Sequence, residues 1–102
     1  MEMKQRLLKI LENFKNKKIL VIGDIMLDKY IWGEVSRISP EAPVQVFNVI
    51  KETYAPGGAS NVASNASALN GKVFMIGIAG NDEAKKTLLE ELKKRGINAD
   101  WI

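Results

Sequence analysis

The stretch ILVIGDIMLD, residues 19–28, decides the fold. Its first four residues form an unbroken apolar run closed by Gly23, which is typical of a short strand buried on both faces of a parallel sheet. Asp24 and Asp28 follow at the carboxyl end of that strand. Ligands of open α/β sheets bind in the crevice at this end, so we expect a binding site here.

The sequence on either side of this stretch predicts alternating helices and strands. Helices are expected over 3–13, 59–69 and 82–95, and two further parallel strands over 72–78 and 97–102. The order is that of an α/β fold with right-handed crossovers, whose helices cover both faces of the sheet.

An extra pair of strands is predicted between the first core strand and the helix that should follow it. Residues 30–35 alternate in polarity, a Ser/Pro-rich loop spans 36–43, and further valines follow. We expect a two-faced antiparallel layer that ends at Pro56-Gly57-Gly58. A plain strand-to-helix loop has about 2 to 6 residues, so this long insertion points to function.

Composition excludes several classes of protein. The 102 residues are 46% hydrophobic and 26% charged, as in a single globular domain. Without Cys or His, the chain has no Cys nucleophile, Ser-His-Asp triad, or thiolate or imidazole metal site. No run approaches the roughly 20 apolar residues of a membrane span, and the start lacks an apolar signal core. A cytoplasmic protein without a membrane partner is expected.

The net charge of +3 does not indicate a nucleic-acid partner. Residues 1–18 carry six Lys or Arg and two Glu, which gives +4, and the remainder sums to −1. The basic excess therefore belongs to one terminal helix and its exit, where a solvated polar face explains it.

Two groups of residues near the first strand are candidates for ligand binding. The Asp28 carboxylate can accept hydrogen bonds from adjacent sugar hydroxyls, although an Asp here can also cap a turn. Gly57 and Gly58 precede a helix and allow a close approach of backbone to ligand, or they mark an ordinary loop-to-helix junction. The run matches neither GxGxxG nor GxxxxGK[ST], so no dinucleotide or Walker site is inferred.

Further candidates lie on the following helix and in the inserted layer. Asn61 and Asn65 stand four apart on one helical face, where side-chain amides cap, bridge elements or bind polyols. Arg37, in the loop SRISPEAP, can pair with a phosphate or carboxylate, or remain solvent-exposed or Glu-paired. The aromatic residues Tyr30, Trp32 and Phe47 favour packing or a subunit interface over a stacking platform.

Three segments resemble the amino-terminal third of the ribokinase-like (PfkB) carbohydrate kinases. They are ILVIGDIMLDKYIWGEVSRISPEAPV, PGGASNVASNASALNGKV and IGIAGNDEAKKTLLEELKKRGI, and together they cover the chain from about Lys18 onward. The first is most similar to the bacterial heptose 7-phosphate kinases of the ADP-heptose synthase type. The Gly-Gly-x-x-Asn helix start marks the wider family.

The resemblance implies a Rossmann-like, three-layer ribokinase-like fold with an inserted β-strand lid at about 30–54. It implies transfer of the ATP γ-phosphate, with Mg²⁺, to O1 of D-glycero-D-manno-heptose 7-phosphate, on the route to lipopolysaccharide core heptose. Asp28 would hold sugar hydroxyls, and Gly57, Gly58, Asn61 and Asn65 would complete the sugar site. The lid would pair with that of a second subunit, giving a homo-oligomer, and Arg37 is the candidate for the phosphate.

One family signature is absent from the sequence. The Asp-x-x-Gly-Ala-Gly-Asp run, which supplies the catalytic base and anion hole, does not occur, and the adenine pocket belongs to the same carboxyl-terminal part. We therefore expect 1–102 to be a single incomplete domain, with its base beyond residue 102. Alone it should bind no ATP and be inactive, and an uncovered apolar face should cause self-association or marginal stability.

Two alternatives remain open at this stage. The chain can be a short non-catalytic module that keeps the sugar face and lid for binding or interaction. It can also belong to a ribokinase-like kinase of different sugar specificity, although the SRISPEAP loop argues against this.

Overall fold

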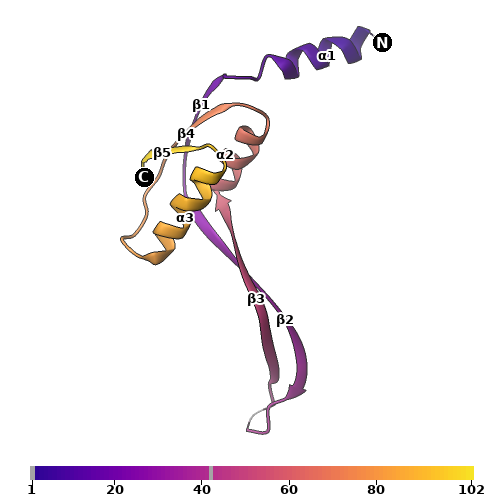
Figure 1. Cartoon of the computed structure of the whole chain (residues 1–102), viewed down its shortest axis with the longest axis vertical. Coiled ribbons are helices and arrows are strands. Elements are labelled where there is room, and N and C mark those ends of the chain that lie inside the picture. Colours follow the sequence, from indigo (N-terminus) through magenta and orange to yellow (C-terminus); the bar gives the residue numbers. More distant parts are fainter. Residues whose placement is uncertain (1, 42) are drawn as a thin grey trace.

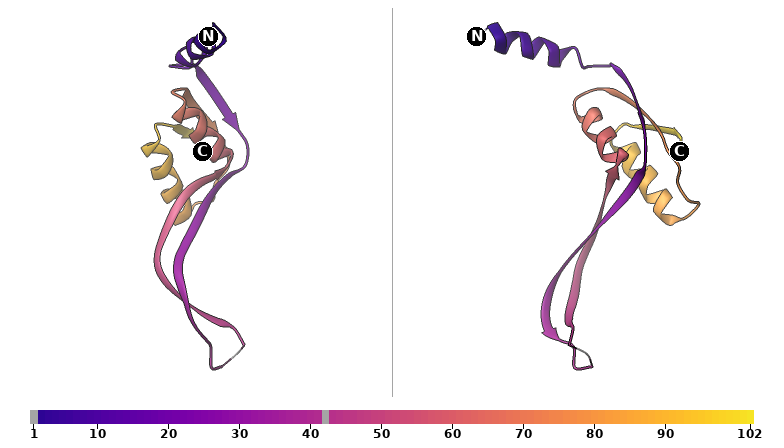
Figure 2. Two further views of the ribbon diagram at one scale, coloured as in Figure 1. Left: turned by 90° about the vertical axis from the view of Figure 1, so that its right-hand side faces the viewer. Right: turned by 180° about the vertical axis from the view of Figure 1, so that it is seen from behind.

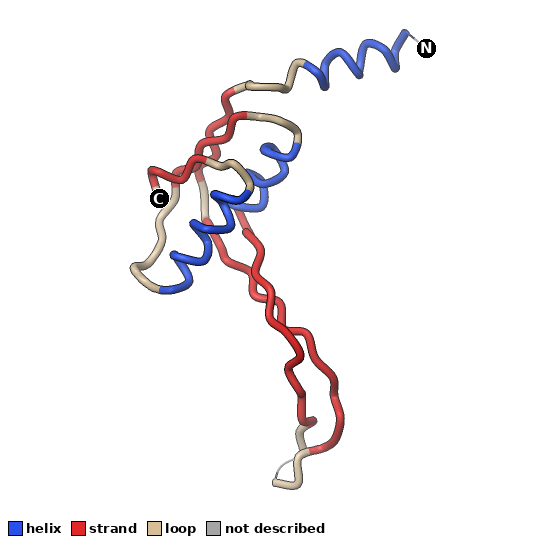
Figure 3. The backbone as a smooth tube through the Cα atoms, in the orientation of Figure 1, coloured by secondary structure: helices blue, strands red, loops and turns tan. Residues whose placement is uncertain are grey.

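The computed structural model describes residues 2–41 and 43–102, with backbone alone at 36–38. Figures 1 and 3 show a small α/β body, a long two-stranded arm and a projecting amino-terminal helix. The elements, in chain order, are α1 (Glu2–Glu12), β1 (Lys18–Ile22), β2 (Ile25–Ile38), β3 (Gln45–Gly58), α2 (Ala59–Ala68), β4 (Lys72–Ile76), α3 (Glu83–Lys94) and β5 (Asn98–Trp101).

The body is built on a parallel sheet in the order β1-β4-β5. Lys18 pairs with Lys72 and Ile22 with Ile76, so β1 and β4 run in register over their full lengths. The predicted parallel sheet is confirmed, including its third strand, although β4 ends at Ile76 rather than at residue 78.

Helices α2 and α3 pack on one face of this sheet (Figure 2). Alternate side chains of β4 point toward them, so Val73 and Met75 are fully buried against Leu88 and Leu92 of α3 and Ala63 of α2. Small residues dominate α2, which lets its backbone lie close to the strands. This single cluster is the core of the described chain.

Local signals in the sequence set the ends of the helices. The Asp82 carboxylate accepts a hydrogen bond from the Lys85 amide at 2.9 Å and caps α3. Gly96 follows α3 with φ of +71°, and Asn70 follows α2 with φ of +73°. Both positions are left-handed, a conformation that Gly and Asn tolerate better than other residues and that commonly ends a helix.

The expectation that helices cover both faces of the sheet is wrong for this arrangement. Because the sheet grows in one direction from β1 through β4 to β5, successive right-handed crossovers place α2 and α3 on the same face. Helix α1, the remaining candidate, projects from the body and buries no residue (Figure 1). The prediction that β1 is buried on both faces fails for the same reason, since Leu20 is 55% exposed and Ile22 is 68% exposed.

The inserted strands form a longer ribbon than predicted. β2 and β3 have 14 residues each and pair antiparallel from Ile25 opposite Gly58 out to Ile38 opposite Gln45. Residues 36–38 therefore belong to a strand rather than a loop, and Pro56-Gly57-Gly58 continues β3 instead of ending it. A proline is tolerated here because a two-stranded ribbon leaves one edge of each strand without a hydrogen-bonded neighbour.

Candidate functional site

The base of the ribbon brings Asp28 and Gly57 together. Asp28 lies opposite Ala55, and Gly57 lies opposite Met26, so all four residues share one face of the ribbon. A Cβ atom on Gly57 would lie 2.5 Å from Oδ2 of Asp28. The Asp28 carboxylate therefore lies over bare backbone, in the space that any other side chain at residue 57 would occupy.

Gly58 turns the chain from β3 into α2. Its φ is +57°, and a Cβ atom there would lie 2.6 Å from the Asp24 carbonyl oxygen. The next amide, of Ala59, donates a hydrogen bond to that oxygen at 2.8 Å. Only glycine satisfies both the left-handed conformation and the close approach. The turn ties the start of α2 to the exit of β1.

Asn61 and Asn65 lie one turn apart on α2 and are exposed. Neither side-chain amide, nor the Asp28 carboxylate, makes a hydrogen bond to any residue that the structure describes. Gly58, the residue at the start of α2, provides no side-chain cap. The capping roles considered for Asp28 and the two asparagines are therefore not used within the described chain, and their polar groups stay available to a ligand.

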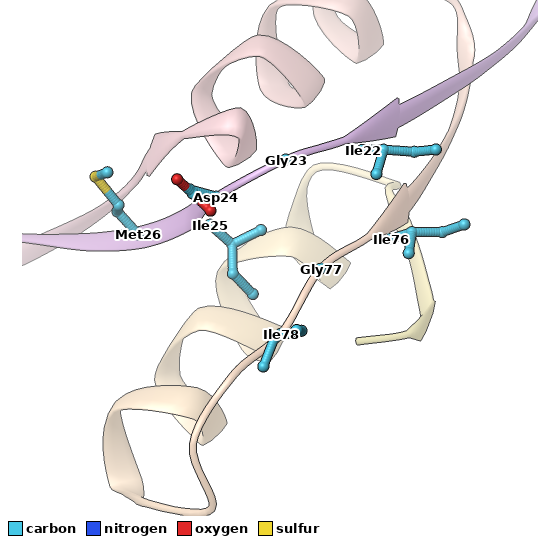
Figure 4. A pocket seen from close by; sticks show the side chains of 8 residues that line it. All are labelled: Ile22, Gly23, Asp24, Ile25, Met26, Ile76, Gly77 and Ile78. Carbon is cyan, nitrogen blue, oxygen red and sulfur yellow. The ribbon is translucent and has the colours of Figure 1, made fainter.

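A hollow opens at the carboxyl ends of β1 and β4, where the sequence predicts a crevice. It measures about 480 Å³ and is lined by Ile22, Gly23, Asp24, Ile25, Met26, Ile76, Gly77 and Ile78. Figure 4 shows Ile25 pointing toward α3, whereas Asp24 and Met26 lie on the other side of the strand. The face of β2 that carries Asp28 therefore begins in this crevice, at Met26, and continues outward along the ribbon.

Arg37 is not brought close to Asp28. Its backbone lies in β2 opposite Val46, nine residues beyond Asp28, which is roughly 30 Å along an extended strand. Its side chain lies outside the described residues. Its assignment to a phosphate stays a prediction.

Two features of this region carried no clear signal in the sequence. Ser60 is fully buried in the first turn of α2, and its Oγ has no hydrogen-bond partner among the described residues. Lys51 lies opposite Trp32 with its ammonium 5.1 Å from the centre of the ring. One lysine in a strand of alternating polarity does not by itself indicate a contact with Trp32. That contact follows only from the register of β3 against β2.

The described residues contain no group of three or more Asp, Glu, Cys or His side chains placed to hold a metal ion. Within the same part of the chain, no helix is long and apolar enough to cross a membrane.

Comparison with known proteins agrees with this architecture. Residues 16–102 match the pfkB family of carbohydrate kinases, and the chain belongs to that family.

Among individual proteins, the chain is similar to several named Bifunctional protein HldE. It is 52% identical over 88 residues to the one from Helicobacter hepaticus, which covers 86% of this chain and 18% of the relative. It is 50% identical over 95 residues to that of Sulfurimonas denitrificans, covering 93% and 20%. For Helicobacter pylori strain J99 the identity is 50% over 86 residues, covering 84% and 19%. The chain spans about a fifth of the length of these relatives.

Proposed function

We propose that this chain forms the sugar-binding side of an ATP-dependent carbohydrate kinase. The observation that carries the proposal is the Asp28 carboxylate, which is exposed, has no hydrogen-bond partner among the described residues and lies over Gly57 at the base of the ribbon. Membership of the pfkB carbohydrate kinase family supplies the class of reaction. The substrate we propose is D-glycero-D-manno-heptose 7-phosphate, phosphorylated at O1 in the cytoplasm.

Each residue of the site has a distinct role in this proposal. The ionised Asp28 offers only acceptor sites, so it takes hydrogen bonds from adjacent hydroxyls of the sugar. Gly57 and Gly58 leave room for the sugar to approach the backbone. The amides of Asn61 and Asn65 both donate and accept, which matches the mixed character of a polyol.

The transfer itself needs groups beyond this site. The O1 oxygen forms a bond to the γ-phosphorus as the bond from that phosphorus to the bridging oxygen breaks and ADP leaves, and the O1 proton passes to a base. We propose that the base and the adenine pocket lie beyond residue 102, and that residues 1–102 are inactive alone. The described residues offer no cluster of metal ligands, so we assign them no step that involves Mg²⁺.

The ribbon is proposed to act as a lid over the sugar and as a dimer contact. Its other face carries exposed apolar residues, namely Ile31, Val35, Phe47, Val49 and Tyr54. An apolar strip on a thin ribbon is stabilised by a second copy of itself. Sedimentation separates this contact from association through the open sheet, because Phe47→Asp should abolish a lid dimer and Leu20→Asp should not.

A second candidate is a non-catalytic module that binds sugar or a partner through the same ribbon. The exposed apolar strip favours it as much as it favours a lid. The downstream reading frame discriminates between the two. Continuation into a Gly-Ala-Gly-Asp run supports the kinase, and a stop codon after residue 102 supports the module. A kinase for another sugar stays open on the same site.

Calorimetric titration tests the proposed site directly. We expect heptose 7-phosphate to bind the chain, MgATP to show no binding, and Asp28→Ala to abolish the sugar signal. Val62→Ala is the matched control, because Val62 is an exposed residue of α2 outside the proposed site. Unchanged sugar binding by the Asp28 variant would contradict the proposal.

A further inference from the structure

The face of the ribbon that carries Asp28 continues outward into a polar and aromatic strip. Strand register places Tyr30 opposite Thr53 and Trp32 opposite Lys51 on this face. Residues 26–32 and 51–57 are all described, and within them Lys51 is the only cation on this face. The other cation in these segments, Lys29, lies on the opposite face and pairs with Glu52 at 3.3 Å.

The Lys51 ammonium lies over the Trp32 ring, and that ring is itself held by a hydrogen bond. The indole Nε1 of Trp32 donates a hydrogen bond to Oγ1 of Thr53 at 3.0 Å, which fixes the ring against the neighbouring strand. The ammonium then lies 5.1 Å from the centre of that ring. A cation over an indole face is attracted electrostatically by the ring. This contact limits the freedom of a side chain that otherwise carries high rotamer entropy.

We infer that Lys51 binds the phosphate of a sugar phosphate whose hydroxyls are held at Asp28. The inference rests on the proposed sugar site and deepens it by assigning the recognition of the phosphate. Trp32 lies four residues beyond Asp28 on the strand, which is roughly 13 Å along the ribbon. Hydrogen-bond reach at either end covers part of this separation, and the carbon chain of a sugar with a terminal phosphate covers the rest.

Charge along the strip supports this order. The carboxylate of Asp28 repels a phosphate from the inner end, and the ammonium of Lys51 attracts it at the outer end. The ligand is therefore oriented with its phosphate away from the crevice. The end of the sugar opposite its phosphate then points toward the carboxyl ends of β1 and β4, where Asp24 lines the hollow. A neutral sugar lacks this orienting attraction.

Binding of D-glycero-D-manno-heptose 7-phosphate and of the same heptose without phosphate should be compared by calorimetry on the whole chain. We expect the wild-type chain to prefer the phosphorylated sugar. Lys51→Gln should lower that preference about tenfold, as for the loss of a hydrogen bond to a charged group, and leave the neutral sugar unaffected. Lys51→Arg should retain most of the preference. Added salt should weaken phosphate recognition in the wild type but not in Lys51→Gln.

Lys29→Gln is the matched control, because it removes the same charge from the opposite face of the same ribbon. Equal losses in the Lys29 and Lys51 variants would reduce the effect to net charge and overturn the inference. If neutral heptose binds in an Asp28-dependent manner while Lys51→Gln keeps the wild-type preference, the Lys51 assignment fails and the sugar site survives. Binding of neither sugar to the wild-type chain would overturn both.

Discussion

The body and the ribbon hold their side chains in different ways. In the body, α2 and α3 close over β4, so Met75 and Leu92 are fully buried. In the ribbon, Tyr30, Ile31 and Trp32 each remain about half exposed, and their positions depend on cross-strand partners. The body therefore supplies stability. The ribbon presents a surface whose geometry is fixed by strand pairing and whose chemistry is left free for a ligand or a partner.

The largest expected difference between the two regions is in stability. Leu92→Ala creates a cavity in the core of the described chain and should cost about 2 to 5 kcal/mol of unfolding free energy. Ile31→Ala removes a half-exposed side chain and should cost well under that amount, within about 1 kcal/mol. Urea denaturation of both variants measures the difference. Similar losses would show that the ribbon and body share one core.

In a second test, which measures binding, a substitution in the ribbon should have a larger effect than one in the body. In Gly57→Ala the new methyl group must displace the Asp28 carboxylate, so the affinity for heptose 7-phosphate should fall at least about tenfold, or 1.4 kcal/mol. Gly80→Ala is the control, because its Cβ would lie 3.3 Å from the nearest neighbouring atom, an Asp82 carboxylate oxygen in the body, and would not overlap it. Calorimetry should show the loss in the first variant alone. Equal affinities of the two variants for heptose 7-phosphate would show that Gly57 is not part of the sugar site.

A third test compares one local hydrogen bond in each region. Asp82→Ala removes the cap of α3 and should lower stability by about 1 kcal/mol. Thr53→Val removes the acceptor for the Trp32 indole on the exposed ribbon and should cost no more than about 0.5 kcal/mol. Thermal unfolding measures both. A larger effect of Thr53→Val would mean that the ribbon is coupled to the folding of the body.

The smallest expected effect depends on pH. The Arg95 hydrogen bond, followed by that of Lys94, lowers the pKa of Glu91 below its ordinary value. A lowered pKa means that the ionised carboxylate stabilises the fold above the ordinary pKa, and that this contribution is lost as the pH falls through the lowered value. Glu91→Gln should therefore cost about 0.3 to 0.5 kcal/mol at neutral pH.

That difference between wild type and Glu91→Gln should disappear in urea titrations below the lowered pKa. A constant difference down to the most acidic conditions would mean that packing, rather than charge, accounts for the effect. Glu91 pairs at 2.7 Å with Arg95, which follows it by four residues on α3, a spacing that brings two side chains together on a helix. Glu91 also contacts the ammonium of Lys94 at 3.1 Å.

The sequence predicted those parts of the fold that are set by local signals. Apolar runs predicted β1 and β4, and the pattern of residues 82–95 predicted α3 close to its observed bounds. The extent of the ribbon was underestimated because Pro56-Gly57-Gly58 carries turn chemistry. Whether such residues pair depends on a partner strand some 30 residues away in sequence.

The site shows the same division. Asp28, Gly57 and Gly58 could be predicted from sequence as candidates for ligand binding, because they follow a strand or precede a helix. Lys51 could not, because only the register of β3 against β2 places it beside Trp32. The exposed face of the sheet could not be predicted from the sequence either, because an apolar run does not reveal which of its faces a helix will cover.

An amide chemical-shift map of the chain during titration with heptose 7-phosphate tests the proposed sugar site most directly. We expect the perturbed amides to cluster at the base of the ribbon and the start of α2, within residues 26–32, 51–58 and 59–65. The amides of α3 and β5 should stay unchanged. Perturbations confined to the body away from this face, or none at saturating sugar phosphate, would contradict the claim that this chain carries a sugar site.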